Sequence, residues 1–330
     1  MRPSGNGLLW DRPQALLANV MRRIERIVIG KRHTIEQLLV ALLCGGHALL
    51  EDVPGVGKTL LAKTTARTLG CSFQRIQCTP DLMPSDITGV AMYRRSTETF
   101  EYRPGPIMAN IVLADELNRT SPKTQSALLE AMEERHVTVD GETHPLPQPF
   151  MVIATQNPSG FEGAYPLPEA QLDRFLLKLS LGYPTREEEA ALLSRAPEAA
   201  ADPGPLLLLE ELRELQRQAA AVHVDEPVKH YIVALTQATR DRPELSLGAS
   251  PRASLGLLRA SQALALLRGR TYVVPDDCRE LAVPVLAHRL ALRPEASFAG
   301  HTAEGVVRLL LDAVPVPSAP AGSKLGGARS

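Results

Sequence analysis

The feature that most constrains this chain is a glycine-rich turn at residues 51–59, which reads EDVPGVGKT. The apolar run HALL (47–50) precedes it, and the helix-like segment LLAKTTARTL (60–69) follows it. A strand–turn–helix of this kind brings backbone N–H groups, a helix N-terminus and a Lys charge to one spot, where they can hold a triphosphate. We therefore predict that a nucleotide lies on Pro54, Gly55, Val56, Gly57, Lys58, Thr59 and Leu60.

The turn departs from the strict phosphate-loop pattern at one position. The pattern is G-x-x-x-x-G-K-[ST], and Asp52 stands where its first glycine is expected. Gly55, Gly57, Lys58 and Thr59 remain, so the half of the turn that faces the phosphates is intact. The departure therefore concerns only the start of the loop.

A second buried strand ends in two adjacent carboxylates. The segment NIVLADE (110–116) is apolar up to Asp115 and Glu116. In phosphate-loop enzymes the loop Ser/Thr and an Asp at the end of a second strand hold Mg²⁺. We assign Thr59 and Asp115 to the metal, Asp115 through a water molecule, and Glu116 to polarising the attacking water. The alternative is a solvated Asp-Glu pair that begins a loop.

Three further polar residues follow or precede predicted elements. FMVIATQNP (150–158) is a buried strand that ends at Asn157, which can hydrogen-bond the attacking water or the γ-phosphate. An ordinary Asn-Pro turn is the alternative. LDRFLLKL (172–179) offers Arg174 before another strand, and SPRA (250–253) offers Arg252 at a helix start. Each arginine could equally be an isolated surface residue.

The order of elements indicates an α/β core followed by a helical domain. Helices are predicted at 13–28 and 35–43; from residue 47 onward, short apolar segments alternate with helices. We expect strands at 47–50, 73–77, 110–114, 150–155 and 175–180, with helices near 58–69, 122–134 and 185–195. This alternation predicts a parallel sheet covered on both faces. Residues 89–107 and 136–146 resemble β-hairpins, the second because of the Asp140-Gly141 turn signal.

An Ala/Pro/Gly-rich stretch at 196–205 predicts a domain boundary. The domains are then a core over 1–197, with its N-terminal helices and the two hairpins, and an all-helical second domain over 205–314. Helices are expected there at 206–221, 227–240, 251–268, 276–291 and 303–313. Residues 315–330 are too poor in apolar residues to fold and are predicted to be disordered.

Composition excludes several classes of protein. The chain has 330 residues, of which 44% are hydrophobic, and a formal net charge of -1, so a nucleic-acid partner is not expected. The four cysteines are far apart and lack the spacing of a zinc site or a disulfide framework. No segment approaches the ~18 apolar residues of a membrane span, and the N-terminus lacks the apolar stretch of a signal peptide. These features predict a cytoplasmic protein with no membrane insertion.

Five motifs in register resemble the MoxR family of AAA+ ATPases. They are EDVPGVGKT, NIVLADELNRTSPKTQSALLEAMEE, FMVIATQNP, EAQLDRFLLKL and GASPRASLGLL, and the resemblance runs over roughly residues 15–312. It implies a P-loop AAA+ αβα sandwich with a parallel five-stranded sheet, a small all-helical lid and a homo-oligomeric ring, usually a hexamer. It also implies a protein partner, with a von Willebrand A-type domain as the suggested class.

The resemblance also gives roles to individual residues. Lys58 and Thr59 match Walker A, and Asp115 and Glu116 match Walker B. Asn157 matches sensor 1, Arg174 the arginine finger and Arg252 the sensor 2 arginine. Val28, Ile29 and Gly30 lie where such proteins contact adenine, and the two hairpins match the helix-2 and pre-sensor-1 insertions of this clade.

The function predicted from the sequence is ATP hydrolysis with Mg²⁺ by a chaperone-like remodelling or maturation factor. ATP is favoured over GTP because no guanine-reading N-K-x-D follows the loop. Three alternatives remain open at this point: a metal-chelatase-type motor subunit, a DNA- or RNA-acting motor, and a nucleotide-gated scaffold that does not hydrolyse ATP.

Overall fold

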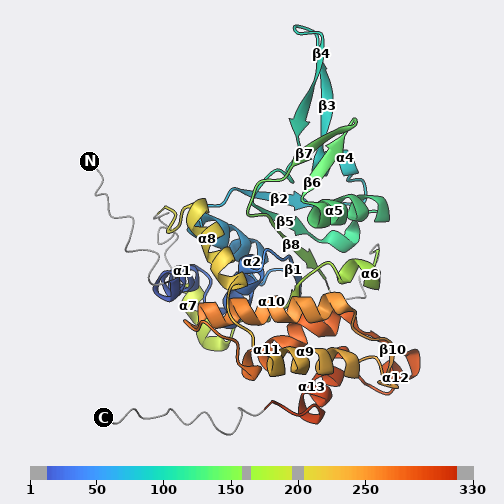
Figure 1. Cartoon of the computed structure of the whole chain (residues 1–330). Helices are drawn as coiled ribbons and strands as arrows, with labels where there is room; N and C mark the ends of the chain where they lie inside the picture. The colour runs from blue at the N-terminus through green and yellow to red at the C-terminus, as the bar shows by residue number, and fades with distance from the viewer. Residues whose placement is uncertain (1–12, 158–164, 195–203, 318–330) are drawn as a thin grey trace.

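A parallel sheet of five strands lies at the centre of the fold. The computed structural model describes residues 13–157, 165–194 and 204–317. The strand order is β2-β5-β8-β1-β9, and every neighbouring pair is parallel (Figure 1). The strands are β1 (Ala48–Glu51), β2 (Phe73–Gln77), β5 (Ile111–Asp115), β8 (Met151–Gln156) and β9 (Leu177–Leu179). The prediction of a five-stranded parallel sheet is thus confirmed, with each strand in its expected segment.

The sheet has an apolar core on each face because alternate side chains of a strand point to opposite sides. In β5, Ile111 and Leu113 join one core, whereas Val112 and Ala114 join the other. The first core also contains side chains of the first three helices, and the second contains those of the helix after β5. The fold is therefore a three-layer αβα sandwich.

The helices of the core follow the predicted pattern. The structure gives α1 (Pro13–Ile27), α2 (Arg32–Leu43), α3 (Lys58–Thr68), α4 (Pro84–Thr88), the 3₁₀ turn η1 (Leu117–Arg119), α5 (Pro122–Glu134), α6 (Glu169–Leu172) and α7 (Arg186–Leu193). Helix α7 begins at a capping box in which Thr185 and Glu188 each bind the other's backbone N–H. The short helices α4 and α6 were not predicted, because a single turn carries no periodic signal.

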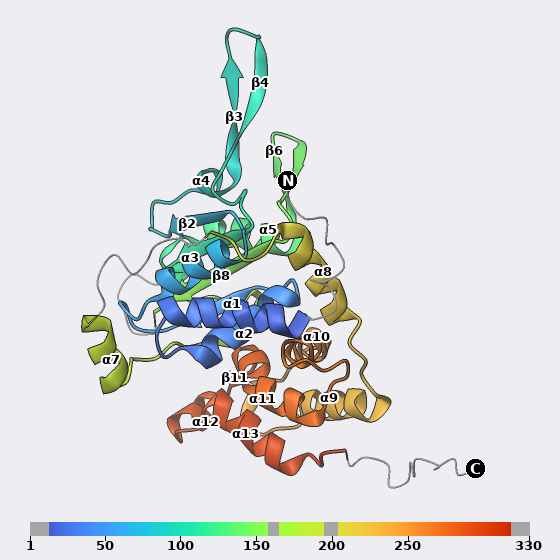
Figure 2. The same cartoon turned by 90° about the vertical axis from the view of Figure 1, so that its left-hand side faces the viewer.

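Two hairpins extend from one side of the sandwich (Figures 1 and 2). Strands β3 (Gly89–Arg94) and β4 (Thr99–Pro104) form the longer hairpin, and β6 (His136–Val139) and β7 (Glu142–Pro145) form the shorter one. Asp140 and Gly141 have φ angles of 50° and 84°, as the tight turn between two twisted strands requires. Tyr102 of β4 stacks on His144 of β7 with ring centroids 3.8 Å apart, so the hairpins contact each other.

The C-terminal part of the chain is mainly helical; its first helix lies beside the sandwich, and the rest lies on the opposite side from the hairpins (Figure 2). It contains α8 (Leu209–Ala220), α9 (Glu226–Ala238), β10 (Leu245–Leu247), α10 (Pro251–Leu267), α11 (Pro275–Leu286), the 3₁₀ turn η3 (Ala287–Arg289), β11 (Ala291–Leu292), α12 (Pro294–Phe298) and α13 (Ala303–Ala313). The antiparallel pair of β10 and β11 is an addition to the predicted helices.

One predicted helix is shorter than expected. The sequence predicts a helix over 276–291, but α11 ends at Leu286. His288 Nε2 then donates to the Phe175 carbonyl oxygen (2.9 Å), and Arg289 Nη2 donates to the same oxygen (2.6 Å). These bonds tie the chain to the segment before β9, and a 3₁₀ turn over Ala287–Arg289 replaces the end of the predicted helix.

The lid shares its apolar core with one face of the sandwich. Leu212 of α8, Leu257 of α10 and Leu281 of α11 belong to the same buried cluster as Leu38 of α2. The Arg268 side chain also donates to Glu36 of α2 and Glu280 of α11. The predicted boundary at 196–205 and the tail at 315–330 lie mostly outside the described residues, so the domain limits stay a prediction. Among the described helices, none is long and apolar enough to cross a membrane.

Candidate nucleotide site

The glycine-rich turn joins the carboxyl end of β1 to the N-terminus of α3. Gly55 and Gly57 have φ angles of 87° and 97°, a region that favours glycine, and Gly57 is the N-cap residue of α3. The first residues of α3 are Lys58 and Thr59, so free N–H groups of the helix lie beside a Lys and a hydroxyl. This geometry is that of an anion site at a helix N-terminus.

A cavity of about 410 Å³ lies over this turn and gathers most of the predicted site. It is lined by Pro54, Gly55, Gly57, Lys58, Thr59, Leu60, Arg75, Asp115, Glu116 and Asn157. Val56 is the one predicted loop residue that does not line it, because its side chain packs against the apolar core. The structure therefore brings the loop, the two carboxylates and Asn157 to one place, as the sequence predicts.

Lys58 lies inside the protein with its charged end at the loop. Its Nζ donates to the backbone oxygen of Asp52 (2.7 Å), and only 8% of the residue is exposed. Burial is the largest effect and lowers the pKa of Lys58 below its ordinary value, while the negative charges of Asp52, Asp115 and Glu116 oppose this shift. The carboxylates thus favour the cationic form, which is the form that binds phosphate.

Thr155 of β8 binds the Asp115 carboxylate and the backbone of Glu116. Its hydroxyl donates to Asp115 Oδ1 (2.7 Å) and accepts from the backbone N–H of Glu116 (2.8 Å). Glu116 itself has a φ angle of 59°, a conformation that L-residues rarely adopt. This turn aims the Glu116 side chain away from the line of β5 and into the cavity.

Glu116 is surrounded by hydrogen-bond donors. Asn157 Nδ2 donates to Oε1 (3.2 Å), Arg119 Nη1 donates to Oε2 (2.9 Å), and Gln77 Nε2 lies 3.4 Å from Oε2. A carboxylate held in this way can accept a proton from a water molecule at a defined position. The Asn157 contact also connects the ends of β5 and β8, which are neighbours in the sheet.

Arg75 lines the same cavity, although the sequence motifs did not indicate it. Its Nη2 donates to Asp115 Oδ2 (2.6 Å) and to Gln77 Oε1 (2.6 Å). Arg75 and Gln77 stand two residues apart on one face of β2, and β2 pairs with β5. Alternate residues of a strand share a face, so the spacing of Arg75 and Gln77 within the predicted strand 73–77 could have indicated that they lie together.

Asp52, the residue that departs from the strict loop pattern, is buried, and its carboxylate accepts three hydrogen bonds. The Asp52 carboxylate accepts from Ser180 Oγ (2.7 Å), from the N–H of Leu181 (2.6 Å) and from the N–H of Gly182 (3.1 Å). Asp52 therefore binds the chain that follows β9, a contact that a glycine could not make.

The three residues predicted at the adenine do not line this cavity. Val28 is buried in the apolar core, and Gly30, with a φ angle of 73°, lies against the Glu188 side chain of α7. Their contact with a base stays a prediction.

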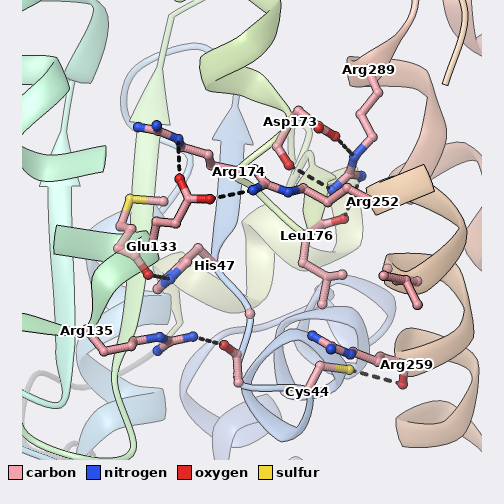
Figure 3. Close-up of a pocket in the computed structure, with 15 residues that line it drawn as sticks. Cys44, His47, Glu133, Arg135, Asp173, Arg174, Leu176, Arg252, Arg259 and Arg289 are labelled. Carbon is pink, nitrogen blue, oxygen red and sulfur yellow. Dashed lines mark hydrogen bonds and ion pairs between the residues drawn. The ribbon is translucent and has the colours of Figure 1, made fainter. Parts of the chain in front are cut away.

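The predicted arginines lie elsewhere, around a second cavity of about 350 Å³ between core and lid (Figure 3). Arg174 Nε donates to Glu133 Oε2 (3.0 Å), and Arg252 pairs with the other oxygen of the same carboxylate. Figure 3 shows both guanidinium groups converging on the Glu133 carboxylate, one at each oxygen. In the described part of the chain, the two cavities share no lining residue.

The second cavity is rich in positive charge. Arg135, Arg259 and Arg289 line it together with Arg174 and Arg252, whereas Glu133 and Asp173 are its carboxylates. It also contains Gly45, Gly46 and His47, which precede β1, while the phosphate loop follows β1. The two cavities thus lie at opposite ends of that strand.

His47, which lines this second cavity, should make the stability of the fold depend on pH. Its Nδ1 accepts the Val152 N–H (2.9 Å) and its Nε2 donates to the Met132 carbonyl oxygen (3.1 Å), so the neutral ring satisfies both bonds. Burial first, and then Arg135, lowers its pKa to about 3. Between pH 6.5 and 3 the unfolded chain therefore binds a proton that the folded chain does not, and stability falls as the pH falls.

We expect this histidine to contribute a loss of about 1.4 kcal/mol in the free energy of unfolding per pH unit below its ordinary pKa. Urea unfolding between pH 7 and 5 would measure it. In His47→Gln the slope of the unfolding free energy against pH should decrease by about 1.4 kcal/mol per pH unit, which is the contribution of one proton. The other buried histidine, His288, should keep its own contribution. An unchanged slope in that variant would contradict the assignment.

Comparison with known proteins agrees with this geometry. Residues 47–177 match the ATPase family associated with various cellular activities (AAA), and residues 237–309 match the AAA lid domain. YeaC of Bacillus subtilis, an uncharacterized protein, is 55% identical over 92% of this chain and 95% of its own length. Chaperone MoxR1 of Mycobacterium tuberculosis is 46% identical over 91% of this chain and 82% of its own length.

A solved crystal structure of a Cytophaga hutchinsonii protein superimposes with a TM-score of 0.86 at 37% identity, covering 93% of this chain and 96% of that one. Protein MoxR of Paracoccus denitrificans is 31% identical over 89% of this chain and 94% of its own length. Fold, nucleotide cavity and relatives all agree, and the chain belongs to the MoxR family of AAA+ ATPases, whose P-loop site hydrolyses ATP.

Proposed function

We propose that this ATPase assembles into a homo-oligomeric ring, with six subunits as the family resemblance implies, and remodels or matures a protein partner in the cytoplasm. Each nucleotide would lie on the phosphate loop of one subunit and be completed by Arg174 and Arg252 of the next. The name of the MoxR1 relative, which is called a chaperone, supports the chaperone-like part of the proposal.

The position of the arginines carries this proposal. Arg174 and Arg252 come from different segments, yet both lie at the end of β1 that is opposite the phosphate loop. An arginine acts on a phosphoryl group only through direct contact with its oxygens. In a ring with head-to-tail contacts, one end of a subunit faces the other end of its neighbour, so two distant half-sites can meet.

The residues of the nucleotide cavity and the two arginines of the second cavity have distinct tasks in this scheme. Lys58 and the N–H groups of Gly55 and Gly57 would bind the phosphates. Glu116 would take the proton of the attacking water, which Asn157 helps to place. Arg174 would stabilise the charge of the transferred phosphoryl group, and Arg252 would report the nucleotide state to the lid.

The cavity also suits a magnesium ion. The Thr59 hydroxyl and the Asp115 carboxylate line the same space, and both offer the hard oxygen ligands that Mg²⁺ prefers. When bound, the ion neutralises the phosphate charge and orients the phosphate oxygens. Arg75, which pairs with Asp115 Oδ2, would share that oxygen with the metal site.

The longer hairpin supports a protein partner. Met92, Tyr93 and Phe100 are 50%, 52% and 73% exposed, although large apolar side chains are usually buried. They belong to β3 and β4, and this hairpin projects beyond the sandwich on the side away from the lid (Figure 1). The proposed partner is a protein with a von Willebrand A-type domain, the class that the resemblance implies.

Light scattering with and without ATP, run beside ATP turnover, tests the ring. We expect ATP to raise the molar mass to that of a ring, and the turnover per subunit to rise with protein concentration. Both changes should occur in the same concentration range because the active site needs two subunits. Full turnover by a strictly monomeric species would refute the proposal.

A further inference from the structure

Asp52 lies between the nucleotide site and a distant part of the chain. Its backbone oxygen accepts from Lys58 Nζ, and its carboxylate accepts three bonds from residues 180–182. The residue is only 6% exposed. A buried carboxylate is costly unless hydrogen bonds stabilise it, so these bonds fix the position of Asp52 relative to residues 180–182.

The segment that Asp52 binds is also attached to the N-terminus of α2. Thr34 Oγ donates to the Ser180 carbonyl oxygen (3.0 Å), and Lys31 Nζ donates to the Tyr183 carbonyl oxygen (3.0 Å). Residues 180–183 are thus held by the phosphate loop on one side and by α2 on the other. Gly30 immediately precedes Lys31, and the same chain continues to α7, where Glu188 lies against Gly30.

We infer that Asp52 is a positioning residue that sets the phosphate loop in register with the base-binding segment 28–30, through residues 180–183. Its substitution should therefore weaken the binding of a whole nucleoside triphosphate more than the binding of a bare polyphosphate. This inference rests on the proposed contact of Val28, Ile29 and Gly30 with adenine.

The backbone does not demand glycine at this position. Asp52 is absent from the described non-glycine residues with positive φ, so its conformation is open to any L-residue. The strict pattern's glycine would fit the backbone but would remove all three carboxylate bonds. Asp52→Gly, which restores the consensus, is therefore expected to impair the site.

Titration calorimetry in the Glu116→Gln background, where ATP hydrolysis is expected to be much slower, provides the test. The two ligands are ATP and inorganic tripolyphosphate, each with magnesium. For Asp52→Gly we expect ATP affinity to fall about ten- to hundred-fold, the range of one hydrogen bond to a charged group. Tripolyphosphate affinity should change by less than about threefold, because the local loop is retained.

Two milder variants keep the test decisive if Asp52→Gly fails to fold. Asp52→Asn retains one acceptor oxygen, and Ser180→Ala removes a single bond to Asp52. Both variants should lower the affinity for ATP, by a smaller factor than Asp52→Gly does. Their affinity for tripolyphosphate should stay nearly unchanged. Equal weakening of both ligands, or unchanged ATP preference in all folded variants, would overturn the inference.

The variant Ile29→Ala tests separately whether residues 28–30 contact adenine, the proposal on which this inference rests. Suppose that Ile29→Ala lowers the affinity for ATP but not for tripolyphosphate, while the Asp52 variants change neither. In that case residues 28–30 bind the base, and the role inferred for Asp52 is wrong. If Ile29→Ala leaves the preference for ATP over tripolyphosphate unchanged, the placement of the base is wrong, and the inference falls with it.

Discussion

Replacing Arg174 with alanine is expected to lower kcat by about 10³- to 10⁵-fold and to leave ATP affinity within a few-fold of wild type. The rate falls because a cation that stabilises the transferred phosphoryl group is lost. Affinity persists because Lys58 and the loop glycines, which line a different cavity, still hold the phosphates. Phosphate release above the assembly concentration and ATP titration measure the two quantities.

Arg259→Ala is the matched control. Arg259 lines the same cavity, but the carboxylate of Glu133 pairs with Arg174 and Arg252 instead. Removing it takes away an equal charge and should leave kcat within a few-fold of wild type. Near-normal turnover by Arg174→Ala, or an equal loss in both variants, would contradict the specific role of Arg174.

Glu116→Gln is expected to bind ATP normally and to hydrolyse it about 10²- to 10⁴-fold more slowly. The amide has nearly the shape of the carboxylate and can accept from Asn157, but it cannot take a proton from water. Single-turnover hydrolysis with saturating enzyme measures the chemical step, and titration measures binding.

Glu130→Gln serves as its control. Glu130 is exposed on α5 and lines neither of the two cavities described above. This variant should turn over ATP at the wild-type rate. Hydrolysis by Glu116→Gln at a similar rate would remove Glu116 from the catalytic role, and loss of ATP binding would show that its charge serves the ground state instead.

The sequence predicted which residues gather around the glycine-rich loop, because most of them follow from local patterns. The loop, Lys58 and Thr59 are consecutive, and their strand–turn–helix setting is visible from hydrophobic patterning alone. The contributions of Asp115 and Asn157 followed from one rule, that parallel strands end at the same edge of a sheet. The structure places both residues in the cavity over the loop.

The remaining parts of the site depend on which segments are neighbours in space. Arg75 reaches Asp115 because β2 pairs with β5, and this strand order cannot be deduced from the order of the strands along the chain. The bonds of Asp52 join residues about 130 positions apart in the chain, and those of Glu133 join core to lid. Short local patterns carry no information about such partners.

The lid was predicted less accurately than the core for a similar reason. Helical periodicity continued past Leu286, but Arg289 is drawn to Asp173 of the core, with Nε 2.7 Å from Oδ1. A tertiary ion pair of this kind overrides local propensity. The same contact lies beside Arg174, so the irregular end of α11 helps to shape the second cavity.

Mixing two inactive variants tests most directly whether the active site is shared between subunits. Lys58→Ala should fail to bind nucleotide, and Arg174→Ala should bind it without turnover. In a mixed ring, a Lys58→Ala subunit can supply Arg174 to a neighbour that holds ATP. We predict recovery of roughly a quarter of the wild-type rate at equal amounts, as random assembly of a cyclic ring gives. Mixed rings that form by light scattering and yet show no activity at any ratio would contradict the account.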